Sequence, residues 1–161
     1  MTTSNQIEFT KELVIERYKF IQDKQKHLDS ILHTNIGMII KLLIALFGLA
    51  VTGLLLYKKT PEVISPKDLV ILFQLSSLLT SFVSAFFLLM TISNIFAWFG
   101  YRKDEVNLLE QFGGSFRREM PQKRSFYTWQ ETGFIVTLII ILFACYITWA
   151  RSAEFVHYLI Q

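Results

Sequence analysis

Three long, mainly apolar segments constrain this 161-residue chain more than any other feature. Residues 69–99 contain no charged side chain in 31 positions, and residues 132–150 contain none in 19. Residues 35–57 contain one charge in 23 positions, that of Lys41. Runs of about 18 or more mainly apolar residues are typical of transmembrane helices, and a soluble domain of this size could hardly bury three of them. We therefore expect an all-α integral membrane protein with three transmembrane helices.

Capping and breaking residues set the expected boundaries. Pro61 ends the first span, Ser65 followed by Pro66 begins the second, and Gly113 with Gly114 stops the helix that continues from it. The predicted organisation is a cytoplasmic amphipathic helix at 1–34, a membrane domain at 35–150 with spans 35–57, 66–100 and 129–150 and a cytoplasmic connector at 101–128, and a short tail at 151–161.

The segment before the first span has the pattern of a long amphipathic helix. Its seam residues recur every three or four positions, which is close to a 3.5-residue repeat. No proline or glycine precedes Gly37, so this helix is expected to continue into the first span. Two alternatives fit the seam: it packs against the same helix of other copies, or it lies on the membrane surface. The seam consists of Val14, Tyr18, Ile21, Gln25, Leu28 and Leu32.

The distribution of basic residues predicts the orientation. Residues 1–34 and 101–128 together carry 11 lysines and arginines, whereas the opposite ends of the spans carry four. Because cytoplasmic loops are enriched in lysine and arginine, we expect a multi-pass protein of the inner (plasma) membrane with a cytoplasmic N-terminus. No short basic region precedes the first span, so the span is expected to remain as an uncleaved anchor.

Polar side chains form a stripe along the second span. Lipid offers no hydrogen-bond partner to a hydroxyl or an amide, so this stripe should face protein or water. One alternative is close helix packing through small polar residues, and the other is the lining of a pore. Either way we expect sister copies to cover the stripe, which predicts a homo-oligomeric helical bundle. The candidate pore-lining residues are Gln74, Ser77, Ser81, Ser84 and Thr91.

The first span carries a charge inside its apolar segment. Lys41 shares one helix face with small residues, among them Gly37 and Gly48, and such a face allows close approach of another helix. The lysine either extends its amine to the cytoplasmic headgroups or lines a vestibule, where it binds an anion or sets ion selectivity.

The connector combines basic and aromatic residues. Basic charge next to aromatic rings is typical of the cytoplasmic membrane interface. The alternative is an anion site for a nucleotide, an oligonucleotide or a phospholipid headgroup, because guanidinium groups bind phosphates and aromatic rings stack on bases. The candidate anion-binding residues are Arg117, Arg118, Lys123 and Arg124.

Catalytic patterns give no support to an enzyme. No phosphate-binding glycine loop, nucleophile motif or zinc spacing occurs. The single cysteine, Cys145, excludes an internal disulfide and gives no metal-binding pattern. Asp104, Glu105 and Glu110 lie near the second span without an accompanying base or nucleophile in the sequence. We expect no enzymatic activity, no cofactor and no metal site.

The layout resembles that of small bacterial membrane proteins of the RipA-like octameric type and of the SLATT-type effectors of anti-phage defence. The resemblance is carried by Tyr18 to Leu32 running into the first span, by Trp98 to Arg102, and by Tyr127 to Glu131. It implies homo-oligomers, from tetramer to octamer, in the bacterial inner membrane. It also implies a partner enzyme that makes a nucleotide or oligonucleotide signal, to which the membrane protein responds by permeabilising the membrane.

Three functional hypotheses follow. The first is a homo-oligomeric ion channel or pore effector that is gated by an anionic nucleotide or oligonucleotide and depolarises the membrane. The second is a non-conducting membrane scaffold or accessory subunit that anchors a cytoplasmic partner. The third, a transporter or lipid-handling component, ranks lower, because inverted repeats and broken helices are missing from the sequence.

Overall fold

A computed structural model describes residues 2–60, 62–121 and 129–160, with the backbone alone for residues 2–9. Within these residues the chain forms four helices: α1 (Thr2–Lys59), α2 (Pro66–Phe112), α3 (Gln130–Ala150) and α4 (Ser152–Ile160). Three of them, α1, α2 and α3, are long and apolar enough to cross a membrane. The predicted all-helical class with three candidate spans is confirmed for the described residues.

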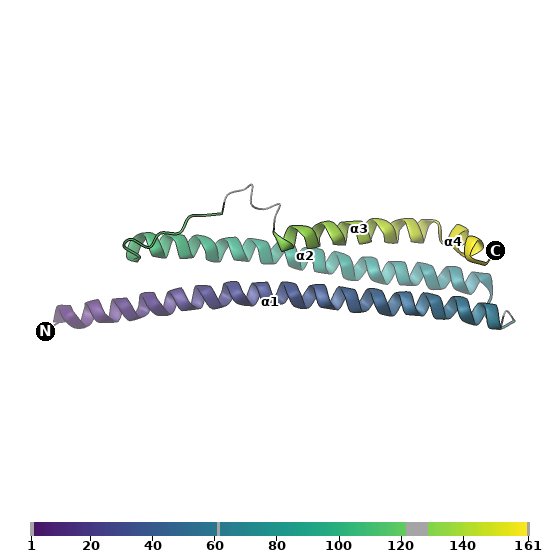
Figure 1. The fold of residues 1–161 in the computed structure, drawn as a ribbon, viewed down its shortest axis with the longest axis horizontal. Helices are drawn as coiled ribbons and strands as arrows, with labels where there is room; N and C mark the ends of the chain where they lie inside the picture. Colours follow the sequence, from purple (N-terminus) through teal and green to yellow (C-terminus); the bar gives the residue numbers. More distant parts are fainter. Residues whose placement is uncertain (1, 61, 122–128, 161) are drawn as a thin grey trace.

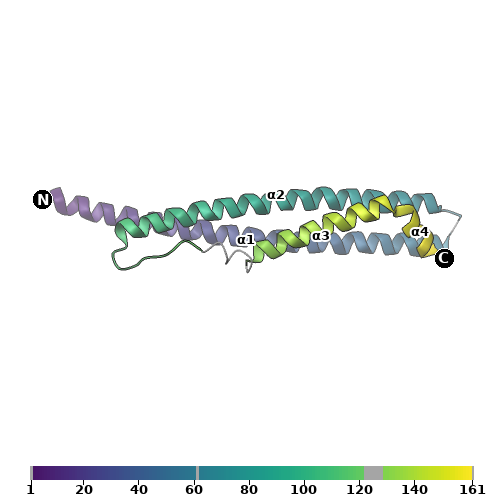
Figure 2. The same ribbon diagram turned by 90° about the horizontal axis from the view of Figure 1, so that it is seen from above.

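The helices form an elongated bundle. Figure 1 shows α1 and α2 lying side by side along most of the molecule, with α3 and α4 beside α2. Figure 2 shows that α3 crosses this pair obliquely. The two chain ends lie at opposite ends of the long axis (Figure 1). The central helix α2 therefore contacts all the others.

The lengths of the helices separate a membrane part from an extension. At about 1.5 Å per residue, α1 is about 87 Å long and α2 about 70 Å, whereas α3 is about 32 Å. The hydrocarbon core of a bilayer is about 30 Å thick, so α3 fits one crossing and the α1–α2 pair must continue beyond it. We call the part of this pair that lies beyond the start of α3 the stalk, which comprises residues 10–33 and 101–112.

Local sequence signals set the ends of the helices. The predicted continuity of the first helix is confirmed, because α1 runs unbroken from Thr2 to Lys59. A reciprocal capping box starts α2: the Asp68 amide donates to Ser65 Oγ at 3.3 Å, and the Ser65 amide donates to Asp68 Oδ2 at 2.8 Å. After Phe112 the amide of Gly113 bonds to the Leu109 carbonyl, and Gly114 has a φ of +57°, which suits glycine.

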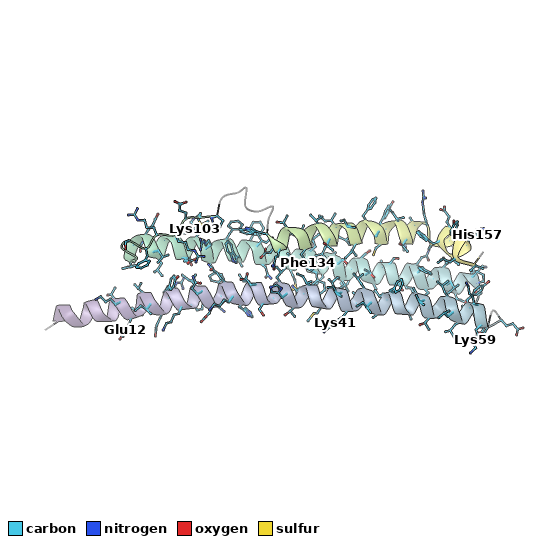
Figure 3. All side chains as sticks on the ribbon, viewed as in Figure 1. Glu12, Lys41, Lys59, Lys103, Phe134 and His157 are labelled. Carbon is cyan, nitrogen blue, oxygen red and sulfur yellow. The ribbon has the colours of Figure 1, made fainter. Side chains whose placement is uncertain are left out.

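Apolar side chains from three helices meet where the stalk joins the membrane part. The buried cluster contains Leu32 and Ile39 from α1, Phe87 from α2, and Phe134 and Leu138 from α3. Figure 3 shows Phe134 at the start of α3. Because α3 packs against side chains of both α1 and α2 in this cluster, its position depends on both long helices.

The seam of the N-terminal arm packs against the chain's own α2. Ile21 is fully buried, Gln25 donates to Glu105 of α2, and the ring of Phe20 contacts Tyr101 edge-on at 6.4 Å. From the sequence, the seam was expected to pack against other copies or to lie on the membrane surface. The heptad spacing could not reveal packing against α2, because it shows neither the length of α2 nor its antiparallel path beside α1. The structure shows a third arrangement, in which the extension of α2 covers the seam.

Candidate functional site

The polar stripe of α2 lies mainly inside the protomer. Thr80 and Thr91 are buried, and their hydroxyls donate to the carbonyls four residues earlier, at 2.8 Å in both cases. Ser84 is fully buried, and within the described part of the chain its hydroxyl has no hydrogen-bond partner. Ser77 is 6% exposed and Ser81 is half-buried. In this arrangement the stripe is packed between helices.

The cover of this stripe differs from the expected one. Sister copies were expected to cover it, but α1 and α3 of the same chain pack on α2 from two sides. Gln74 is also used internally, since its Nε2 donates to Ser152 Oγ of α4 at 3.0 Å. The physical reason is that one chain supplies two further spans, which suffice to shield most of a single polar face. Ser84 and Thr91 are consequently closed to any shared pore in this conformation.

A cavity of about 390 Å³ interrupts this packing between α1 and α3. Its walls are apolar residues of α1, including Leu43 and Leu46. Its polar lining comes from α2 and α3: Ser76, Ser77, Thr80, Cys145 and Thr148. Of the five predicted pore-lining residues, Ser77 therefore lines this cavity, which is open to the outside of the bundle.

Lys41 lies away from both the stripe and this cavity. Its side chain is exposed on the side of α1 that faces away from α2 (Figure 3). Gly37 and Gly48 lie on the same side, and a Cβ atom added at either would meet nothing within 4 Å. The predicted face of small residues is thus open to lipid or to another molecule.

The stalk contains a buried carboxylate, Glu105, to which the sequence had suggested no role. The side chain of Glu105 is fully buried and accepts four hydrogen bonds. Two come from α1, where Gln22 Nε2 lies at 2.8 Å from Oε1 and Gln25 Nε2 at 3.3 Å from Oε2. Arg102 and Arg118 each donate one through Nη1 at 2.8 Å. We call these five residues the Glu105 cluster.

Three segments of the chain meet in the Glu105 cluster. Gln22 and Gln25 belong to α1, Arg102 to α2, and Arg118 to the segment that follows α2. Arg102 also donates through Nη2 to the Glu119 carbonyl at 3.0 Å, which holds this segment to the stalk a second time. By contrast, the nearby Arg17–Asp104 pair at 3.0 Å is about half exposed. Among the described residues, the buried cluster therefore links both helices of the stalk to the segment that follows α2.

Ionisation of Glu105 is favoured despite its burial. Burial alone raises the pKa of a carboxyl group, because it penalises the charged form. Hydrogen bonds from Gln25, Arg118 and Arg102, together with the positive charge of Arg102, outweigh this effect and hold the pKa of Glu105 below its usual range. The cluster therefore contains a carboxylate at neutral pH.

This lowered pKa predicts a pH dependence of the stalk. The contribution of Glu105 to stability is present above its ordinary pKa, about 4.3, and is lost as pH falls through the lower folded value. We expect hydrogen exchange of amides 101–112, corrected for intrinsic rates, to stay constant from pH 7 to 5 and to accelerate below pH 4. Glu105→Gln should remove this acid step. Loosening of the wild-type stalk between pH 6 and 5 would contradict the assignment.

The four residues of the predicted anion site differ in their surroundings. Arg118 forms an ion pair with Glu105, although half of its side chain remains exposed (51%). Arg117 is exposed, whereas Lys123 and Arg124 lie outside the described residues. The sequence does contain one signal of the cluster that was not used: Arg102 and Glu105 have the i, i+3 spacing of a helical ion pair. Gln25 within the apolar seam was a second signal.

Comparisons with known proteins give no family assignment. No family model, curated protein or solved structure matches the chain. Among the described residues, no group of three or more histidine, cysteine, aspartate or glutamate side chains is placed to hold a metal ion. Membership in the RipA-like or SLATT-type proteins stays a prediction.

Proposed function

We propose that the chain is a homo-oligomeric membrane effector, whose stalk responds to an anionic nucleotide or oligonucleotide and whose response is ion conduction. The observation that carries this proposal is the Glu105 cluster, a fully buried carboxylate held by three segments of the chain. A ligand shifts an equilibrium only through different affinities for its two states. The cluster supplies such a difference, because one of its cations is accessible from outside.

Arg118 is the group through which a ligand acts. It is half exposed, and Arg117 next to it is exposed. A phosphate bound by these two guanidinium groups competes with Glu105 for Arg118. Release of Arg118 leaves the buried carboxylate with fewer partners, which destabilises the closed stalk. When no anion is present, Arg118 stays paired with Glu105, and this ion pair stabilises the closed stalk.

The polar stripe of α2 connects the stalk to conduction. In the closed form α1 and α3 cover Ser84 and Thr91. Movement of α1 against α2 at the stalk propagates along both helices, because each is continuous into the membrane part. Separation of α1 or α3 from α2 would expose the stripe to water in a bundle of several copies. The open face of α1 around Gly37, Lys41 and Gly48 offers a surface for the neighbouring copy.

One observation favours the second candidate, a non-conducting scaffold. Because the protomer covers most of its own polar stripe, packing alone accounts for those residues. The stalk would then present a fixed surface to a cytoplasmic partner. A nucleotide-synthesising enzyme is the partner expected for the effector, and an anchored protein is the one expected for the scaffold. Both place the N-terminus in the cytoplasm and the spans in a bacterial inner membrane.

Ion flux from liposomes tests the proposal. Full-length protein is reconstituted, and flux is recorded with and without nucleoside triphosphates and cyclic dinucleotides as probes. We expect Glu105→Gln, which weakens the hold on Arg118, to raise probe-free flux several-fold over the wild type. Glu110→Gln makes the same charge change at an exposed site of α2 and should not alter flux. Flux at the lipid background for every protein, with and without probes, would remove the channel and leave the scaffold.

A further inference from the structure

A second cavity lies where the three long helices meet at the end of the stalk. It has a volume of about 450 Å³, within the range of small-molecule sites. Asp29 and His33 come from α1, Trp98 from α2, and Trp129 and Glu131 from the beginning of α3. Leu32 and Gln130 complete the lining. Neither the Glu105 cluster nor the polar stripe contributes to this cavity.

An aromatic cluster builds one wall of this cavity. The rings of Trp98 and Trp129 are 4.9 Å apart at an interplanar angle of 68°. Phe99 stacks on Trp129 at 5.4 Å and 28°, and contacts Trp98 edge-on at 5.7 Å. Each indole is thereby supported by two other rings, so both are held in place. Indole rings that line a cavity attract organic cations, because the ring faces carry negative electrostatic potential.

Two carboxylates give the same cavity a negative charge. Asp29 is exposed and Glu131 is half-buried. They come from α1 and α3, so they line the cavity from two helices. The N-terminus of α3 adds a partial positive charge of about half a unit, which Glu131 in its first turn offsets. The two carboxylates make the lining negative, which disfavours a free anion and favours a cation.

We infer that this cavity binds an organic ammonium group. The tryptophan rings take its alkyl substituents and its charge, and Asp29 and Glu131 neutralise it. The cavity lies at the end of the membrane-spanning segments, where tryptophans mark the membrane interface. Two sources supply an ammonium at this level, the ethanolamine headgroup of a lipid and a soluble amine. The inference is independent of the proposed channel.

Tryptophan fluorescence of the full-length protein tests the inference. Trp149→Phe removes the third tryptophan, which lies on the exposed surface of α3, so emission reports Trp98 and Trp129. The protein is held in maltoside detergent at pH 8 and constant ionic strength and titrated with choline. The uncharged isostere 3,3-dimethyl-1-butanol is titrated in parallel. We expect a saturable change with choline and none with the alcohol.

Carboxylate variants identify the site. Glu131→Gln should weaken choline binding about tenfold, which corresponds to about 1.4 kcal/mol, and the further change Asp29→Asn should abolish it. Glu110→Gln, an exposed carboxylate outside the cavity, should bind as the parent protein does. Helical circular dichroism and the unliganded emission maximum show whether each variant is folded. Equal responses to choline and the alcohol, or equal affinities of Glu131→Gln and Glu110→Gln, would overturn the inference.

A lipid arm distinguishes the two sources. The Trp149→Phe protein is placed in nanodiscs of phosphatidylglycerol, either alone or mixed with phosphatidylethanolamine. If the ethanolamine lipid competes with choline, the ammonium comes from a lipid headgroup. If choline binds equally in both membranes, the site takes a soluble amine. Absence of choline binding in both membranes and in detergent counts against the site itself.

Discussion

Glu105→Ala is expected to open the stalk while leaving the spans folded. The substitution leaves Arg102, which is 7% exposed, without its carboxylate and removes the acceptor of Gln22 and Gln25. Removal of one partner from a buried ion pair costs about 3–5 kcal/mol. Hydrogen exchange of the amides at 101–112 should therefore accelerate by about two orders of magnitude or more. Exchange within α3 should change little, because the hydrogen bonds described for the cluster join α1, α2 and the segment that follows α2.

Asp104→Ala is the matched control for this prediction. It removes an adjacent carboxylate of the same helix, whose ion pair with Arg17 is about half exposed. Exposed pairs contribute about 0–1 kcal/mol, so exchange in the stalk should change less than tenfold. If the two substitutions had the same effect, the Glu105 cluster would not be the link that holds the stalk, and the proposed response to an anion would lose its basis.

Much of the fold could be predicted because its signals are local. The lengths of the uncharged segments indicated three spans, and Ser65 with Asp68 fixed the start of α2 through contacts three residues apart. Gly113 and Gly114 indicated its end in the same way. These features depend on bilayer thickness and on backbone hydrogen bonds near the residue, neither of which needs a tertiary structure.

The Glu105 cluster could not be predicted in full, because its partners are distant in sequence. Gln22 and Gln25 lie 83 and 80 residues from Glu105. Helical spacing shows which residues share a face, but not which other face lies opposite. The one local pair, Arg102 with Glu105, resembles many exposed ion pairs until its burial is known. Whether Gln22 and Gln25 reach Glu105 depends on the register of α1 against α2, which the sequence does not show.

The polar stripe shows a related limit. The spacing of Ser77, Ser84 and Thr91 indicated that they face protein or water, and in the structure all three are buried in protein. The same spacing does not show whether the covering helices belong to the same chain or to a sister copy, because an apolar helix surface of either can bury the stripe. In the described structure α1 and α3 supply it. Whether copies assemble through the open face of α1 stays a prediction.

Ser84→Leu should destabilise the membrane part, although the change makes a span more apolar. Ser84 is fully buried in the packing of α2, and its hydroxyl has no hydrogen-bond partner among the described residues. A leucine there needs space that α1 or α3 must yield, and such overpacking costs about 1–3 kcal/mol. We expect a lower midpoint of unfolding in a sodium dodecyl sulfate titration followed by circular dichroism.

Ser93→Leu provides the comparison, since it makes the identical chemical change at an exposed position of the same helix. Leucine in contact with lipid is slightly favourable, by a few tenths of a kcal/mol, so the midpoint should stay or rise. Opposite signs at two positions nine residues apart would separate packing from hydrophobicity, because only packing distinguishes them. If Ser84→Leu were as well tolerated as Ser93→Leu, α1 and α3 would not cover the stripe, and the stripe would face lipid or a water-filled pore.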